Sequence, residues 1–333
     1  MTAKIIEQEL KRLERAVPPK YRDILYQFYE VVKKALETAD QPQELFLEQF
    51  LLFLTLVEEQ FRLPYQFQPY HQKIREPIDY YRFGLEFVRP LIDSVHSHLW
   101  GDERVICIEQ QLEAGENAIL LANHQTETDP QAISILLEKR HPQLAEKIIY
   151  VAGERVVTDP LAIPFSMGCD LLCIYSKRYI DHPPELKAKK QLHNKHTMER
   201  MSRLLSEGGK VIYIAPSGGR DRRNVEGVIE VAPYDPQSLE MLLLMAKKSK
   251  RETHFYPLTL ATYELFPPPE GIQQELGEAR LAKYSPIQIS FLPEFDMNHF
   301  PGADLSDREE RRKARAEAIW KIVNQEHRKL LRQ

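Results

Sequence analysis

The 333-residue sequence lacks the features that mark several large classes of protein. It has three cysteines and no Cys-x-x-Cys pair, so neither a disulfide framework nor a zinc site of that spacing is expected. No apolar run reaches the roughly 20 residues that a helix needs to span a bilayer. Neither sign of charge dominates, because 45 Lys and Arg stand against 49 Asp and Glu, and nucleic acid is therefore not expected as a partner.

The first 16 residues carry three glutamates among their basic residues. This segment is too acidic for a transit peptide and too polar for a secretory signal sequence. We therefore expect a protein of a reducing compartment, either the cytoplasm or, for a processed plant protein, the plastid stroma. The thiols of Cys107, Cys169 and Cys173 lie in or beside apolar runs, so we expect them to be reduced and buried.

Two kinds of pattern follow each other along the chain. Up to about residue 74 the apolar residues recur at helical spacing, which predicts a small antiparallel bundle with helices at 5–13, 21–39 and 45–62. Short apolar runs then alternate with helical patterns, which predicts an α/β fold with a mixed, largely parallel sheet flanked by helices. We place the bundle in residues 1–76 and the α/β domain in residues 77–333. Strands are expected at 105–109, 118–123, 148–152, 171–175, 210–215, 254–261 and 286–292, and helices at 83–99, 131–140, 187–205, 238–248 and 307–332.

The most informative segment covers residues 118–130, in which an apolar run ends at Asn123-His124 and Asp129-Pro130 follows. This order predicts a buried strand, a turn and a helix start, with an imidazole and a carboxylate at the rim of the sheet. A His beside a carboxylate can remove a proton from a hydroxyl near neutral pH. Taken alone, however, Asp129 is equally well an N-terminal helix cap and His124 a polar residue at a strand end.

A second strand end, at residues 211–223, leads into Pro216-Ser217-Gly218-Gly219 and the arginines Arg220 and Arg222. Glycines let the backbone approach a ligand closely, and a guanidinium matches phosphate oxygens in geometry. Ser217 lacks the Gly-x-Ser-x-Gly flanks of a hydrolase nucleophile, so we interpret it as a turn residue.

The expected strand 171–175 is followed by two basic residues, Lys177 and Arg178, and then by Tyr179. The helical stretch 187–200 is rich in Lys, His and Arg. The simplest interpretation of this stretch is a solvated helix face. The alternative is a binding surface for an acidic partner.

Residues 123–130 and 214–222 resemble the soluble glycerol-3-phosphate 1-O-acyltransferases of chloroplasts and of chlamydia-like bacteria. The resemblance extends over about residues 20 to 295, including 75–81, 151–156, 159–161, 255–258 and 267–269. It implies transfer of a fatty acyl group from a thioester to the sn-1 hydroxyl of glycerol 3-phosphate, the first step of phospholipid synthesis. It also implies that His124 is the general base, that Asp129 orients it, and that Arg220 and Arg222 bind the phosphate.

The remaining phosphate ligands of the family fall in a Ser-Lys-Lys-His segment, which reads Ser176-Lys177-Arg178-Tyr179 here. Arg178 keeps the positive charge, whereas Tyr179 replaces an imidazole by a phenol that can still donate a hydrogen bond. We expect direct displacement without an acyl-enzyme, and neither a metal nor a redox cofactor, because a thioester is already activated.

The expected partners are glycerol 3-phosphate and an acyl donor, acyl-carrier protein or acyl-CoA, with a peripheral membrane contact on product release. The acidic carrier would dock on the basic stretch 187–200. Three alternatives differ in function: acylation of 1-acyl-glycerol 3-phosphate, a non-catalytic acyl-carrier-binding relative, and a serine hydrolase that uses Ser217.

Overall fold

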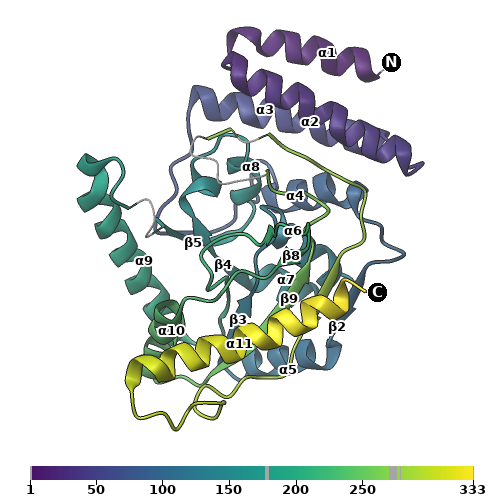
Figure 1. Cartoon of the computed structure of the whole chain (residues 1–333). Coiled ribbons are helices and arrows are strands. Elements are labelled where there is room, and N and C mark those ends of the chain that lie inside the picture. The colour runs from purple at the N-terminus through teal and green to yellow at the C-terminus, as the bar shows by residue number, and fades with distance from the viewer. Residues whose placement is uncertain (1, 177–179, 270–275, 278, 333) are drawn as a thin grey trace.

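The computed structural model describes residues 2–176, 180–269, 276–277 and 279–332. Three amphipathic helices come first and lie together at one end of the molecule (Figure 1), as predicted: α1 (Thr2–Arg12), α2 (Pro19–Thr38) and α3 (Glu44–Arg62). A short 3-10 helix, η1 (Leu13–Arg15), follows α1, and Pro19 occupies the first turn of α2, where its missing N–H costs nothing.

The N-terminal helices share one apolar core with α4 (Tyr80–Val88), α6 (Asp129–Leu137) and α8 (Ile163–Ser166). Aromatic rings fill this core, and the ring of Phe28 lies 6.0 Å from that of Phe87 while Phe53 lies 5.5 Å from Phe165. The division of the chain at residue 76 stays a prediction.

The described residues form one eight-stranded sheet in the order β1-β5-β4-β6-β3-β9-β10-β2. Neighbours from β5 to β9 run parallel, β1 and β10 pair antiparallel with β5 and β9, and β2 is parallel to β10. The predicted mixed, largely parallel sheet is thereby confirmed. Its strands are β1 (Tyr70–His71), β2 (His98–Trp100), β3 (Asn117–Ala122), β4 (Ile148–Gly153), β5 (Asp170–Ile174), β6 (Val211–Ile214), β9 (Thr253–Ala261) and β10 (Gln288–Phe291).

Helices cover both faces of this sheet, so its central strands are apolar on both sides. In β3, Leu120 packs into the core beneath α5 (Asp102–Glu113), α6 and α7 (Pro142–Lys147). Its neighbours Ile119 and Leu121 face the opposite core, beneath α9 (Lys187–Glu207), α10 (Pro236–Ser249) and α11 (Arg308–Leu330). Figure 1 shows α11 crossing this face of the sheet.

Short elements complete the chain. They are the 3-10 helices η2 (Arg89–Leu91), η3 (Glu154–Val157) and η4 (Pro184–Leu186), and a small antiparallel ribbon of β7 (Arg222–Arg223) and β8 (Ile229–Glu230). Strands of two or three residues, such as β1 and β2, carry too little sequence pattern to be predicted.

The predicted strand at 105–109 is wrong, because this segment lies inside helix α5. The apolar run Val105-Ile106-Cys107-Ile108 suggested a strand, but only Val105, Ile108 and Leu112 are buried, at the three- and four-residue spacing of a helix. Ile106 and Cys107 are exposed, so the expected burial of the thiols holds for Cys169 and Cys173 and is wrong for Cys107.

The predicted helix 83–99 is also wrong in extent. Helix α4 begins three residues earlier, where the Asp79 side chain accepts from the N–H of Arg82 (3.0 Å), and it ends at Val88. Pro90 has no N–H to continue the α-helical hydrogen bonds, so the chain tightens into the 3-10 helix η2, becomes extended at Ile92 and then leads to β2 at the sheet edge.

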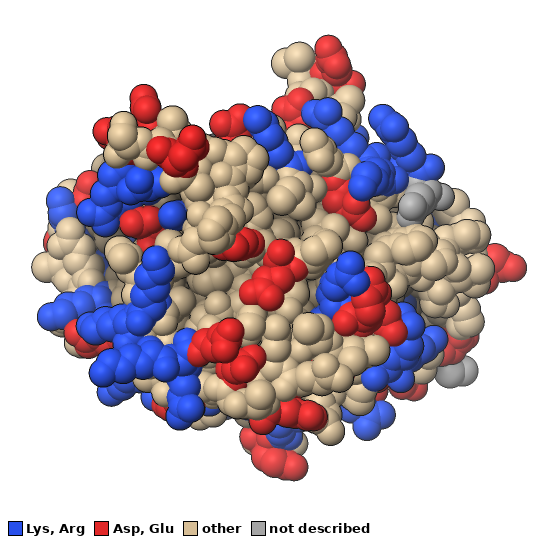
Figure 2. Space-filling model, turned by 90° about the horizontal axis from the view of Figure 1, so that it is seen from below, with Lys and Arg blue, Asp and Glu red and all other residues tan. Residues whose placement is uncertain are grey.

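Charge is mixed over the surface. Figure 2 shows Lys and Arg side chains interspersed with Asp and Glu over the face seen from below. No described helix combines the length and apolarity that crossing a bilayer requires.

Candidate active site

The carboxyl ends of the parallel strands bring the sequence motifs to one edge of the sheet. Strands β3, β5, β6 and β9 run in the same direction, so the residues that follow them emerge together. These are Asn123 and His124 after β3, Ser176 after β5, the Ala215–Arg222 loop after β6, and Thr262 after β9. Ligands bind at this edge in open α/β sheets.

His124 and Asp129 form a hydrogen-bonded pair. Nδ1 of His124 lies 2.8 Å from Oδ2 of Asp129. An ionised carboxylate only accepts, so Nδ1 carries the proton and Nε2 keeps its lone pair. The His124 side chain is 29% exposed, and Nε2 is hydrogen-bonded to no residue that the structure describes. The imidazole therefore presents a basic nitrogen to the outside of the fold.

Asp129 is held far more tightly than its partner, because its side chain is only 1% exposed. Its carboxylate accepts the backbone N–H of Gln125 (2.8 Å) and of Thr126 (3.2 Å), and the hydroxyl of Thr262 (2.6 Å). These donors fix the carboxylate at the start of α6, where the helix dipole also favours a negative charge. Thr262 was missed from the sequence, although it directly follows a predicted strand.

The arginine loop touches the turn that carries His124. The N–H of Asp221 donates to the carbonyl oxygen of His124 at 2.6 Å. Arg220 lies on one side of Asp221, with Nη1 3.7 Å from the carboxylate of Glu127, and Arg222 on the other, donating to the carbonyl of Pro269 (2.8 Å). The structure thus brings Arg220 and Arg222 beside the His124 turn.

Glu127 is a centre of charge that the sequence did not predict. Its carboxylate lies between Arg220 and Arg280, with Nη2 of Arg280 at 3.2 Å. The same Nη2 lies 3.2 Å from Asp159, whose side chain also accepts from the N–H of Leu161 (3.0 Å). These side chains are 6 to 22% exposed, so two guanidiniums and two carboxylates form a largely buried ion cluster. Glu127 lies in the His124 turn itself, which is the only sequence signal that pointed to it.

Gln125 connects the same turn to the C-terminal helix. Its side-chain oxygen accepts the N–H groups of Thr262 (2.6 Å) and Tyr263 (2.9 Å). Its amide nitrogen lies 2.9 Å from Nε2 of His327 on α11. His327 is fully buried, and burial lowers its pKa to about 4, so its Nε2 is an acceptor for the amide.

The third predicted segment lies largely outside the described residues, since Lys177, Arg178 and Tyr179 are not among them. Before it, at the end of β5, a cavity of about 170 Å³ opens between the chain at 64–67 and η3. Aromatic and aliphatic side chains line it, among them Tyr65, Phe67, Val157, Ile174 and Tyr175.

The basic stretch on α9 is divided between surface and interior. Lys187, Lys189 and Lys195 are exposed. Lys190, in contrast, is buried, with its ammonium 3.1 Å from the carboxylate of Glu154 and donating to the carbonyl of His182 (2.8 Å). The expectation that the whole stretch faces a partner is therefore wrong at Lys190.

Two further side chains form hydrogen bonds apart from the His124–Asp129 pair. Ser217 Oγ donates to the carbonyl of Gly219 (2.9 Å) inside its own turn, as expected of a turn residue. His254, at the start of β9, lies between Glu116 (2.9 Å) and Glu294 (2.8 Å). Burial opposes the charged form of His254, whereas the two carboxylates raise its pKa, and in the protonated ring both nitrogens donate to them as an ion triad.

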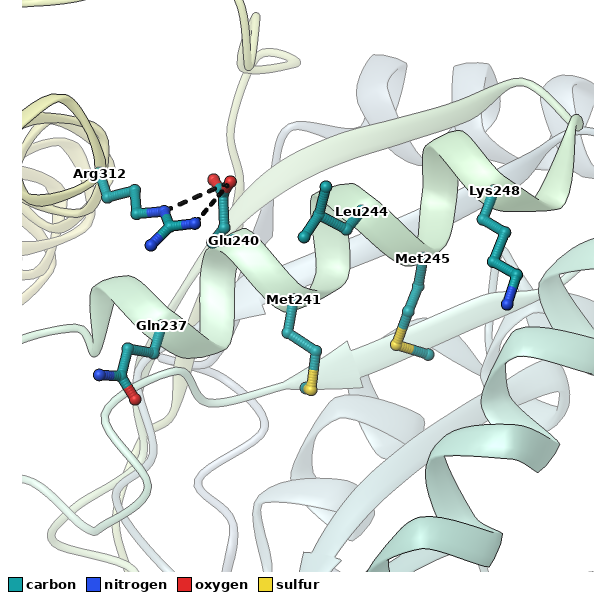
Figure 3. A pocket seen from close by; sticks show the side chains of 7 residues that line it. All are labelled: Gln237, Glu240, Met241, Leu244, Met245, Lys248 and Arg312. Carbon is teal, nitrogen blue, oxygen red and sulfur yellow. Dashed lines mark hydrogen bonds and ion pairs between the residues drawn. The ribbon is translucent and has the colours of Figure 1, made fainter. Parts of the chain in front are cut away.

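The groove in Figure 3 is also remote from the pair. It measures about 340 Å³ and runs along α10, with the ion pair of Arg312 and Glu240 towards one end and Lys248 at the other. Met241, Leu244 and Met245 supply its apolar part, and none of its lining residues carries the chemistry of the His124 turn.

Comparison with known proteins agrees with this arrangement. Residues 104–261 match the acyltransferase family, which places the chain in that class. The chain is 40% identical over 265 residues to the chloroplastic glycerol-3-phosphate acyltransferase of Arabidopsis thaliana, covering 79% of this chain and 58% of that protein. Chloroplastic glycerol-3-phosphate acyltransferases of Spinacia oleracea and Cucurbita moschata are 36% and 38% identical, over 96% and 91% of this chain and 68% of each relative.

The chain therefore belongs to the glycerol-3-phosphate acyltransferase family of chloroplasts, and the resemblance drawn from its motifs is confirmed. It spans between 58 and 68% of the length of these relatives.

Proposed function

We propose that this chain transfers a fatty acyl group from a thioester to the sn-1 hydroxyl of glycerol 3-phosphate. The observation that carries the proposal is the His124–Asp129 pair, whose basic Nε2 is open to solvent beside a loop that holds Arg220 and Arg222. Membership of the family supports the same acceptor.

In the proposed reaction the phosphate is bound by Arg220 and Arg222, with Lys177, Arg178 and Tyr179 as further ligands. Charge-assisted hydrogen bonds to a phosphate are each worth about 1.5–3 kcal/mol. They hold the acceptor so that its hydroxyl lies at Nε2 of His124. Orientation of a bound reactant lowers the barrier as effectively as basicity does.

His124 then takes the hydroxyl proton on Nε2 while the oxygen attacks the thioester carbonyl. The new C–O bond forms, an oxyanion develops and the C–S bond breaks, and the proton passes from Nε2 to the leaving thiolate. Asp129 keeps the ring in the required tautomer and stabilises the imidazolium, as the carboxylate does in a Ser-His-Asp triad. No acyl-enzyme is formed, because the acceptor oxygen takes the place of a serine.

We further propose acyl-carrier protein as the donor. It would dock on the exposed cations of α9, Lys187, Lys189 and Lys195, because an acidic carrier is attracted to a basic surface. Acyl-CoA is chemically equivalent at the thioester. A peripheral membrane contact on product release and a location in the plastid stroma or the cytoplasm remain parts of this proposal; the named relatives are chloroplastic.

The test is an assay of thiol release from acyl-carrier thioester, with and without glycerol 3-phosphate. We expect release that depends on the acceptor and yields 1-acyl-glycerol 3-phosphate. Release with 1-acyl-glycerol 3-phosphate as the better acceptor would shift the function to the second acylation. Binding of the acyl donor without release would identify a non-catalytic relative.

A further inference from the structure

Asp221 touches three consecutive residues of the turn that carries His124. Its carboxylate accepts from the side-chain amide of Asn123 (2.8 Å) and from that of Gln125 (3.2 Å), and its N–H donates to the carbonyl of His124 (2.6 Å). A fourth contact, from the N–H of Ala232 to Oδ1 (2.9 Å), holds the other carboxylate oxygen.

The side chain has no access to solvent, so its oxygens are hydrogen-bonded by protein groups and not by bulk water. Burial raises the pKa of Asp221 to about 6, while the donors from Asn123, Ala232 and Gln125 pull it downwards. Burial of a carboxyl group is unfavourable unless hydrogen bonds compensate for the lost contact with water, and these contacts provide that compensation.

The neighbours of Asp221 in the chain are the two arginines proposed to bind phosphate. Arg220 and Arg222 are partly exposed, whereas Asp221 between them is fully buried. Asp221 therefore fastens the buried side of the arginine loop to the turn of the proposed base, in addition to the more exposed ion pair of Arg220 and Glu127.

We propose that Asp221 is a positioning residue that holds the His124 imidazole in register with the phosphate-binding arginines. This inference rests on the proposed function. The imidazole itself is oriented by Asp129, whereas Asp221 sets where the turn lies relative to Arg220 and Arg222. Loss of Asp221 then leaves a basic His124 and charged arginines, but at the wrong separation for one glycerol 3-phosphate.

The experiment compares two acceptors, glycerol 3-phosphate and glycerol, with wild-type protein and Asp221→Asn. Asparagine keeps the shape but turns one oxygen into an NH2 group, which would face the amides of Asn123 and Gln125. Glycerol lacks a phosphate, so only glycerol 3-phosphate uses the arginines. Its advantage, the ratio of kcat/KM for glycerol 3-phosphate to kcat/KM for glycerol, therefore measures how well His124 is aligned with Arg220 and Arg222.

We expect this advantage to fall by about 10- to 100-fold in Asp221→Asn, since misplacement of a reacting group by about 1 Å costs about that much. A purely structural role would lower the rates with both acceptors by the same factor, through a smaller folded fraction. An unchanged ratio overturns the inference.

Asp307→Asn is the matched control, because the Asp307 side chain caps the start of α11 by accepting the N–H of Glu310 (2.8 Å). If Asp221→Asn does not fold, Asn123→Ser removes one donor to the same carboxylate, and the acceptor ratio must fall in that variant as well. Failure of wild-type protein to use glycerol 3-phosphate would reject the proposed function instead, before any variant is measured.

Discussion

The carboxylate of Glu127 lies 3.2 Å from the guanidinium of Arg280, and it also faces Arg220 at 3.7 Å. A phosphate has the same charge sign as this carboxylate and also accepts hydrogen bonds from guanidinium groups. We therefore expect Glu127 to compete with phosphate for the two guanidiniums.

Replacement Glu127→Gln should tighten the binding of inorganic phosphate by about two- to fivefold, the range expected for a partly exposed ion pair. Titration calorimetry at low ionic strength measures the effect. Glu264→Gln is the control, because Glu264 also pairs with two cations, but with Arg223 and Lys283 instead of Arg220 and Arg280. Weaker phosphate binding in Glu127→Gln would mean that Glu127 orients the arginines rather than competing for them.

His124→Ala should lower kcat by about 10²–10⁴-fold, the usual contribution of a general base. Initial rates of thiol release at saturating glycerol 3-phosphate give this number. His96→Ala serves as control, because His96 also binds an aspartate, Asp93 (2.7 Å), but lies exposed on the surface. Wild-type kcat in His124→Ala would reject the mechanism.

Charge reversal of Lys189 and Lys195 together should reduce kcat/KM for an acyl-carrier donor by about three- to tenfold at low salt. Short CoA thioesters should be unaffected, since they need no docking surface. The control is the double variant Lys313→Glu and Lys321→Glu on α11, which has the same net charge as the double variant on α9. If both donors slow down equally, α9 is not the docking surface. Lys190 is unsuitable for this test, because reversal of its buried charge beside Glu154 would destabilise the fold.

His254 should stabilise the fold in acid and lose this effect in alkali. Its pKa is raised by Glu294 and Glu116, so the stabilisation is fully present below the ordinary His value and disappears as pH rises through the folded-state pKa. His254→Gln should therefore lower Tm by a few degrees at pH 6, at about 2–4 °C per kcal/mol, and by less at pH 8. Thermal melts at both values test this, with His98→Gln, an exposed His, as control. An equal loss at the two pH values would contradict the triad.

The effect of His327 on stability should have the opposite pH dependence to that of His254. Burial lowers its pKa to about 4, so the unfolded chain binds the proton more readily, and stability falls as pH decreases from about 6.5 to 4. The slope is up to about 1.4 kcal/mol per pH unit. His327→Met should remove this part of the acid sensitivity in urea unfolding at pH 5, 6 and 7, whereas the exposed His299→Met should not. A variant as acid-sensitive as the wild type would show that His327 is already solvated.

The sequence predicted most of the sheet and the His124, Asp129, Arg220 and Arg222 set, because strand ends and polar turns are local signals. It did not predict Thr262, Arg280 or His327, which reach the site from remote parts of the chain. Only the pairing of β9 with β3 brings Thr262 to Asp129. The error at 105–109 has the same origin: a short apolar run fits a strand or a buried helix, and packing decides between them.

The contact between Gln125 and His327 has a consequence for synthesis of the chain. Domains form from the N-terminus onwards as they leave the ribosome, yet the turn that carries the base contacts a residue 202 positions later in the chain. A nascent polypeptide can thus assemble its sheet while the loop around the imidazole is still incompletely packed, and packing of this loop is complete only once α11 has been synthesised.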